Sequence, residues 1–174
     1  MSTLELKELS HPAGQVIKIA SGKTLDLKSS GTTTLPTGSV LQVIQGTCEA
    51  DTSTSSTSWQ ATTLFATITP SSTSSKILVT CHTTMYMPDN GTGAITVFRD
   101  STEVTGEPNG LRRGWMNGTR GVFTISGEVL DSPSSTSTIT YKIYLKSLDA
   151  SYSVNVPDGG QHEYSSLTLM EIQG

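Results

Sequence analysis

Long hydrophobic runs are missing from this 174-residue sequence. No apolar stretch approaches the roughly 20 residues that a helix needs to cross a bilayer, so we expect no membrane insertion. The first nine residues carry charges throughout and lack the continuous apolar segment of a secretory signal peptide. We therefore expect a chain that is made in the cytoplasm and stays there at least initially.

Positive charge is also scarce, because 11 Lys and Arg residues stand against 15 Asp and Glu and leave a net charge of -4. A nucleic-acid-binding surface needs a basic stripe to neutralise phosphates, so we expect no nucleic-acid partner. Leu, Ile, Val and Phe together make up only about a fifth of the chain, close to the level at which a sequence can no longer bury a core. This composition favours a domain that completes its core against copies of itself.

Cysteine occurs only at Cys48 and Cys81. Their separation fits neither a metal-ligand spacing nor a Cys-x-x-Cys motif. In a cytoplasmic chain we expect two small buried or half-buried hydrophobic side chains rather than a disulfide.

Motifs of catalysis are absent too: there is no nucleophile elbow, no phosphate-binding glycine loop and no His-Glu-x-x-His. Glu103 and Glu107 flank an expected turn, where solvated carboxylates are commoner than an acid/base pair. The turn at 89–93 lacks the spaced acidic ligands of a calcium site. The histidines stand apart in the sequence, at His11, His82 and His162. We therefore nominate no catalytic residue, no metal site and no cofactor, and predict that the chain is not an enzyme.

Ser and Thr are abundant, at about three in ten residues, and from residue 39 onward apolar residues alternate with polar ones. Alternation with period two, broken by turn formers, predicts a succession of strands. No stretch shows sustained helical periodicity. The sequence thus predicts an all-β domain over 39–174, a jelly-roll-like β-sandwich. Its expected strands are 39–47, 59–69, 76–86, 94–99, 103–105, 121–130, 137–147, 151–156 and 166–172.

Two of these strands show their faces clearly. In 76–86, Ile77, Val79 and Cys81 share one face, and in 137–147 the inward face is expected to carry Ile139, Tyr141, Ile143 and Leu145. The segments 68–77 and 130–139 resemble each other, since each joins two strands through a polar loop with an early proline. We expect these two loops at the same end of the sandwich. The Ser/Thr tract 52–58 is interpreted as a surface loop.

Residues 1–38 differ from the rest, because short apolar groups alternate there with turn formers and cannot bury their own side chains. Pro36 and Gly38 mark the junction with the domain. Either this segment packs on its own domain or several copies wrap into a shared stalk, and the repetition of short apolar groups favours the stalk. The side chains expected to meet in that stalk are Val16, Ile17, Ile19, Leu25, Leu27 and Leu35.

The segment 108–118 is predicted to be a glycine-rich surface loop with a large aromatic, two guanidinium groups and amides. These groups stack on sugar rings and bind carboxylates or phosphates, but an exposed tryptophan is more often a subunit contact. Both interpretations stay open, with the subunit contact favoured. The candidate residues are Arg112, Arg113, Trp115 and Asn117.

Several short segments make the chain resemble the fibre and decoration proteins of tailed bacteriophages, especially those of marine and cyanobacterial phages. These segments are 21–27, 35–43, 68–79, 98–102, 130–133 and 169–172, and together they span nearly the whole chain. The resemblance implies a non-enzymatic homotrimer in the virion, assembled in the host cytoplasm. Its N-terminal part would attach to other virion proteins, and its β-sandwich would be displayed outward.

The expected function is therefore that of a trimeric tail or head fibre with a host-surface adhesion role, and a host cell-surface glycan is a possible ligand. Three copies would multiply weak contacts by avidity. The alternative is a decoration or cement protein that stabilises the capsid shell without binding the host. A carbohydrate-active enzyme is a third hypothesis, for which the sequence offers no acid/base pair.

Overall fold

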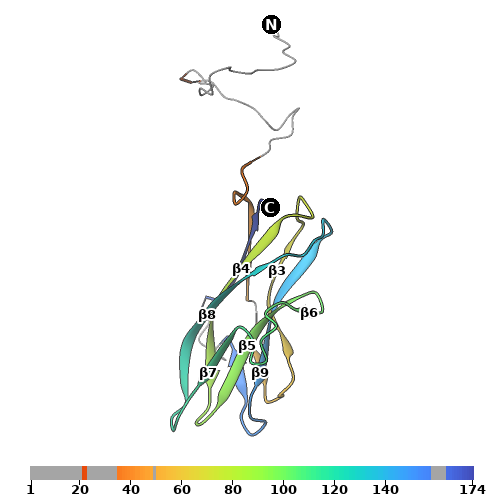
Figure 1. Ribbon diagram of the computed structural model, residues 1–174. Helices are drawn as coiled ribbons and strands as arrows, with labels where there is room; N and C mark the ends of the chain where they lie inside the picture. The colour runs from red at the N-terminus through yellow and green to blue at the C-terminus, as the bar shows by residue number, and fades with distance from the viewer. Residues whose placement is uncertain (1–20, 23–34, 49, 158–163) are drawn as a thin grey trace, which may run out of the picture. The chain divides into compact units, whose positions relative to one another are not determined.

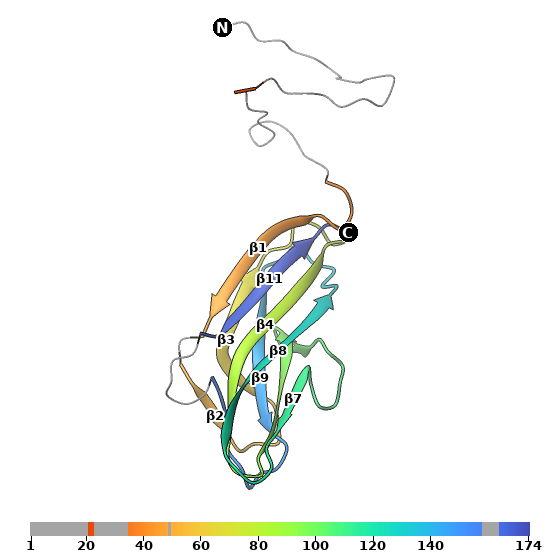
Figure 2. The same cartoon turned by 90° about the vertical axis from the view of Figure 1, so that its left-hand side faces the viewer.

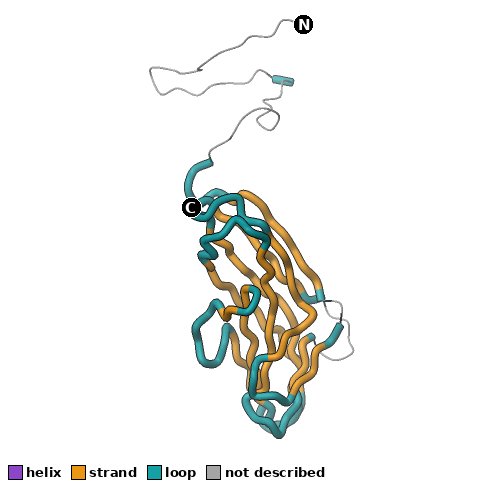
Figure 3. The backbone as a smooth tube through the Cα atoms, turned by 90° about the vertical axis from the view of Figure 1, so that its right-hand side faces the viewer, coloured by secondary structure: helices purple, strands orange, loops and turns teal. Residues whose placement is uncertain are grey.

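The computed structural model describes residues 21–22, 35–48, 50–157 and 164–174. The chain divides into the units Met1–Thr34 and Leu35–Gly174, and the strands among the described residues lie in the second. No helix occurs among the described residues, which confirms the all-β prediction (Figure 3). Of the predicted stalk contacts only Leu35 is described, as an exposed side chain. The others, Val16, Ile17, Ile19, Leu25 and Leu27, lie outside the described residues.

In the described part, the strands form two antiparallel sheets that face each other (Figures 1 and 2). The first, called here the β4 sheet, contains β1 (Val40–Thr47), β2 (Thr52–Thr54), β4 (Lys76–Met87), β8 (Gly121–Asp131), β10 (Val154–Val156) and β11 (Ser166–Ile172). The second, the β9 sheet, contains β3 (Gln60–Ile68), β5 (Thr92–Arg99), β6 (Thr102–Glu103), β7 (Arg112–Trp115) and β9 (Ile139–Ser147).

Three strands of the sandwich are interrupted, so that each consists of two shorter strands. β1 continues as β2, β10 continues as β11, and β6 and β7 pair in turn with the same strand, β5. With each interrupted strand counted once, the first strand pairs with the last (β1 with β11) and the second with the next to last (β3 with β9). The same order continues inward with β4 beside β8 and β5 beside β7. The chain is therefore folded back on itself as one long antiparallel ribbon, whose strands are divided between two sheets.

Most strand positions agree with the sequence prediction to within a few residues, and two assignments were wrong. The tract 52–58 was expected to be a loop, yet its first three residues form β2 against β10. Likewise, residues 112–115 of the expected loop 108–118 form β7 against β5. Neither segment has alternating apolar residues, because β2 is all Ser and Thr and the inward position of β7 is Gly114. Pairing with a neighbour, rather than burial of their own side chains, makes them strands.

The core lies between the sheets and includes the predicted inward faces, since Ile77, Val79 and Cys81 are fully buried. The inward residues predicted for 137–147 are buried as well: Ile139, Tyr141, Ile143 and Leu145. Further side chains from both sheets complete the core, among them Leu64, Met85, Ile95, Val97, Leu167 and Leu169.

The two similar loops lie at the same end of the sandwich, as predicted. Ile68 at the end of β3 pairs with Ile139, and Ile77 at the start of β4 pairs with Asp131. The loops touch each other directly, with the hydroxyl oxygens of Thr69 and Thr138 2.9 Å apart. Figure 2 shows β4 beginning and β8 ending on this side, near the C-terminus.

A carboxylate is buried at this end. The side chain of Glu171 is fully covered and accepts hydrogen bonds from Gln42 Nε2 at 2.6 Å and from Ser75 Oγ at 2.7 Å. The backbone nitrogen and the hydroxyl of Ser71 each donate to it at 2.7 Å. Burial by itself raises the pKa of Glu171, but the hydrogen bonds from Ser71, Ser75 and Gln42 outweigh it and hold the pKa below its ordinary value. Four donors thus replace the water that the charge has lost.

Gly46 allows β1 to close against β3 at the edge of the sandwich. A Cβ atom placed on Gly46 would overlap the backbone carbonyl oxygen of Phe65 and would lie 3.2 Å from the Cβ of Ala66. Because the obstacle is backbone, no side-chain rotation can relieve it.

We expect the substitution Gly46→Ala to destabilise the domain by about 3 kcal/mol or more, since β1 must move away from β3. Urea unfolding followed by tryptophan fluorescence would measure the loss. Thr47→Ala, one residue away on the exposed face of β1, is the matched control and should change stability by less than about 0.5 kcal/mol. Equal stability of the two variants would contradict the close approach of β1 and β3.

The Glu171 site predicts a dependence of stability on pH. Because the folded pKa lies below the ordinary value of 4.5, the carboxylate stabilises the fold above that pH, and the stabilisation is lost as pH falls through the folded pKa. Glu171→Gln should therefore be less stable than the wild type by about 2 kcal/mol at pH 7, with the difference shrinking below about pH 4.5. Urea midpoints between pH 3 and pH 7 test this, with Glu128→Gln on the exposed face of β8 as the control. A constant difference at every pH would refute the role given to the charge.

Candidate functional site

The segment predicted as a ligand or subunit contact lies at one edge of the β9 sheet, in β7 and the turn after it. Gly114 points into the sandwich, because a Cβ atom there would overlap the ring of Phe123. Arg112 lies on the same side of β7, with its stem against Gly127 and its Nε donating to the carbonyl oxygen of Ser126 at 2.9 Å. Arg112 therefore closes the edge between the sheets.

Arg113 and Trp115 project from the opposite side of β7, since alternate residues of a strand face opposite ways. The two predicted arginines are thus separated by the strand and do not form one guanidinium patch. Trp115 is 67% exposed in the single chain, and Asn117 is exposed in the turn that follows. Trp115 and Arg113 are therefore the members of the predicted group that share an accessible face.

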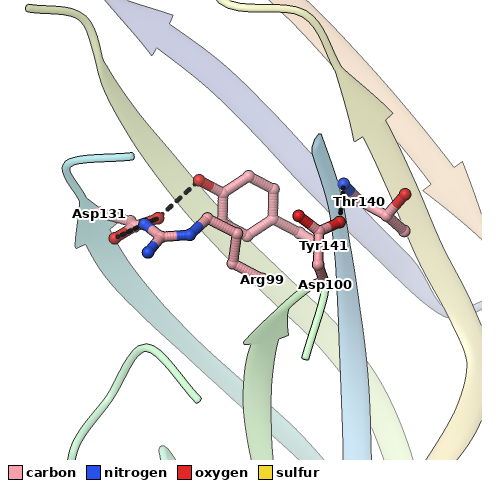
Figure 4. A network of polar contacts seen from close by, with 5 residues as sticks. All are labelled: Arg99, Asp100, Asp131, Thr140 and Tyr141. Atoms are coloured by element: carbon pink, nitrogen blue, oxygen red, sulfur yellow. Dashed lines mark hydrogen bonds and ion pairs between the residues drawn. The ribbon is translucent and has the colours of Figure 1, made fainter. Parts of the chain in front are cut away.

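Arg99 is committed to an ion pair (Figure 4). Its Nη1 donates to both carboxylate oxygens of Asp131, at 2.9 and 2.7 Å, and the hydroxyl of Tyr141 donates to the same carboxylate at 2.7 Å. The three side chains come from β5, β8 and β9, so the network joins both sheets. Burial, together with the hydrogen bond to Asp131, raises the pKa of Tyr141, which keeps the phenol protonated as the donor.

The cysteines behave as small hydrophobic side chains, as predicted. Cys81 is buried in the core, Cys48 is half-buried, and both are free thiols. Burial, with a smaller contribution from Cys48, raises the pKa of Cys81 to about 12, so its reactive thiolate is suppressed.

The outer face of the β4 sheet carries a row of apolar side chains that crosses four strands. Val43 on β1 pairs with Met170 on β11, Met170 pairs with Leu78 on β4, and Leu78 pairs with Leu130 on β8. Val43 and Leu130 are 55% and 53% exposed, although they are large and apolar. We call these four residues the apolar row. The next row across the same sheet is polar: Gln45, Thr168, Thr80 and Glu128.

The outer face of the β9 sheet has a different character, because it is aromatic and cationic. Phe65 on β3 pairs with Lys142 on β9, which pairs with Phe98 on β5. The ring of Tyr144 stacks on that of Phe98 with a centroid separation of 4.0 Å. The ammonium of Lys142 lies 5.2 Å from the centroid of the Phe65 ring. We call Phe65, Phe98, Lys142 and Tyr144 the aromatic face.

The loop between β6 and β7 covers the part of this sheet next to the aromatic face. Gly110, with φ of 70°, lies so close to β5 that a Cβ atom would meet the carbonyl oxygen of Ile95 at 2.5 Å and the ring of Trp59 at 2.6 Å. Lys146 lies 4.2 Å from the centroid of the Trp59 ring and donates to the carbonyl oxygen of Pro108 at 2.9 Å. Trp59 is thus occupied in holding the loop.

Beside Arg112 the surface is slightly hollowed. A polar depression of about 210 Å³, lined by Thr80, Arg112, Ser126, Gly127 and Glu128, is smaller than the ~300–1,000 Å³ of typical small-molecule sites. No group of three or more potential metal ligands occurs in the part of the chain that the structure describes. The same part contains no helix long and apolar enough to cross a membrane. Of the histidines, His82 is exposed on β4, and His11 and His162 lie outside the described residues.

No protein-family model matches the sequence, and a search of the curated proteins finds no similar one. A function for this chain is therefore inferred from its own residues and from the two outer faces of its sandwich.

The network in Figure 4 can be tested by removing one partner at a time. Tyr141→Phe deletes one hydrogen bond to a charged group and should cost about 1–2 kcal/mol of unfolding free energy. Asp131→Asn should cost more, about 2–3 kcal/mol, because it also breaks the ion pair with Arg99. Thermal or urea unfolding measures both. Asp89→Asn in an exposed turn is the control. An equally small effect of all three substitutions on the free energy of unfolding would contradict the stabilising role given to the network.

Proposed function

We propose that this chain is a structural protein of a bacteriophage virion, a homotrimeric tail or head fibre that is displayed on the particle surface and adheres to the host. Residues 1–38 attach the protein to other virion proteins and form the shared stalk. The resemblance to phage fibre and decoration proteins suggests this role, and the exposed apolar row is the observation that carries it. The protein acts by assembly and display rather than by catalysis.

The strand pairing supports a jelly roll as the fold of the displayed head. In a jelly roll, an antiparallel ribbon of eight strands is wound into two sheets, so that the first strand lies beside the last. β1 beside β11, β3 beside β9, β4 beside β8 and β5 beside β7 follow this order. Jelly rolls are common in viral capsid and lectin domains.

The apolar row supports self-association. Large contiguous apolar patches are rare on the surfaces of soluble monomers. Here the exposed Val43 and Leu130 lie in one row with the half-buried Met170 and Leu78 across four strands of the sheet. Four strands spaced about 4.8 Å apart make the row roughly 14 Å wide. No member of the row is charged, so several copies can meet there around a common axis without bringing like charges together. Burial of the row would add apolar contact to that made by the core of one copy.

We expect the full chain to be a trimer at micromolar concentration. The substitution Val43→Glu should raise the dissociation constant of the trimer at least about tenfold, because it would bring three carboxylates together in an apolar contact. Light scattering or sedimentation measures the mass. Thr47→Glu, also exposed on β1 but beside the polar part of the sheet, is the matched control and should remain trimeric. A monodisperse wild-type monomer would refute the proposal.

A chain starting at Leu35 separates the roles of the two segments, because Leu35–Gly174 is a compact unit. If it remains a trimer, the heads associate through their own surfaces, and the N-terminal segment is free to act as the anchor. Virions that lack the protein distinguish the fibre from the cement protein: the fibre predicts lost adsorption with intact capsids, and the cement protein predicts fragile capsids with normal adsorption.

A further inference from the structure

The aromatic face has the composition of a ligand surface rather than of a covered one. Phe65 is 48% exposed, and the rings of Phe98 and Tyr144 are half-buried, although all three project from the outer side of a sheet. β3, β9 and β5, which carry them, lie side by side (Figure 1). Large rings held in place by neighbouring strands present a flat, rigid surface at little cost in side-chain entropy.

Lys142 lies in this surface, and its charge is not neutralised by a carboxylate among the described residues. Its ammonium makes no hydrogen bond and no ion pair with any residue that the structure describes, and the ring of Phe65 is its neighbour. The hydroxyl of Tyr144 likewise has no hydrogen-bond partner among the described residues. An ammonium and a hydroxyl beside these rings are therefore donors for an incoming acceptor.

The charges around the aromatic face are mainly positive. Lys146 and Arg113 pair with Ala94 from opposite sides, so they lie on the same outer face of the β9 sheet. One of the three ammonium donors of Lys146 is used by Pro108, which leaves two. Two carboxylates border this face. Glu103, paired with Phe98, already accepts at its Oε1 from Thr96 at 2.7 Å and from Thr105 at 2.6 Å, and Asp100 accepts from the backbone nitrogen of Thr140 at 3.0 Å. In a protein of net charge -4, Lys142, Lys146 and Arg113 on one face favour an anionic ligand there.

We propose that the aromatic face binds an anionic polysaccharide, one whose sugars bear carboxylate or sulfate groups. The C–H faces of the sugar rings pack on Phe65 and on the stacked pair of Tyr144 and Phe98, and an acidic group bonds to Lys142. The inference rests on the proposed display of the head at a host surface and names the class of ligand recognised there.

The geometry fits a polymer better than a single sugar. Lys142 and Lys146 lie on the same side of β9, about 13 Å apart for a strand rise of ~3.3 Å per residue, with Tyr144 between them. A chain lying along β9 can therefore bring two acidic groups to two lysines while a sugar packs on the ring between them. A second copy of this protein is a poorer occupant, since packing copies here would bring like charges together, whereas the apolar row has none.

The test measures binding of the full-length protein to three polymers: dextran sulfate, polygalacturonate and uncharged dextran. We expect titration calorimetry to show at least about tenfold tighter binding of the two anionic polymers than of dextran, weakening as salt is added. Lys142→Gln should weaken anionic binding about tenfold. Lys76→Gln removes the same charge from the outer face of the β4 sheet and should leave binding within about twofold of the wild type.

A second pair of variants tests stacking. Phe65→Ala should weaken binding about fivefold or more, while Val122→Ala, which shortens an exposed side chain on the β4 sheet, should not. Absence of binding to both anionic polymers, equal binding to dextran, equal losses for Lys142→Gln and Lys76→Gln, or an inert Phe65→Ala would each overturn the inference. The mass of the same samples separates the two proposals: a trimer that binds no polymer refutes only the ligand, and a wild-type monomer refutes the proposed function.

Discussion

The end of the sandwich that carries the two proline-containing loops depends on the buried carboxylate of Glu171. A charge without a counter-cation is tolerated in a covered site only if hydrogen bonds replace its water. Gln42 on β1, Ser71 and Ser75 in the β3–β4 loop, and Glu171 on β11 must therefore keep their positions together. This requirement ties the first strand to the last and holds the loop through which the chain crosses from one sheet to the other.

The same end is secured a second time by polar contacts between the sheets. Asp131 at the end of β8 receives bonds from Arg99 on β5 and from Tyr141 on β9, so β8, an edge strand, is tied to the opposite layer. At the other edge Gly46 removes a side chain and lets β1 approach β3. The apolar core between the sheets is thus supported by hydrogen bonds and by close backbone contact.

These outer faces differ because of which residues the register aligns. Across the β4 sheet it places Val43, Met170, Leu78 and Leu130 in one uncharged row, and across the β9 sheet it places Phe65, Lys142 and Phe98 in another. An uncharged apolar row suits association of copies, and rings with free cations suit an anionic ligand. The proposed trimer and the proposed polysaccharide site therefore use opposite faces and need not compete.

The sequence by itself determined the all-β class, most strand positions, the inward faces of β4 and β9, and the shared end of the two proline-containing loops. Alternation is a local property, and it records which side of a strand is buried. Only the tertiary structure decided that the Ser/Thr segment of β2 and the glycine-containing β7 are strands, that Arg112 and Arg113 face opposite ways, and which side chains meet across each sheet. Those outcomes depend on pairing between residues that are far apart in the chain, and strand register is not written in the local pattern.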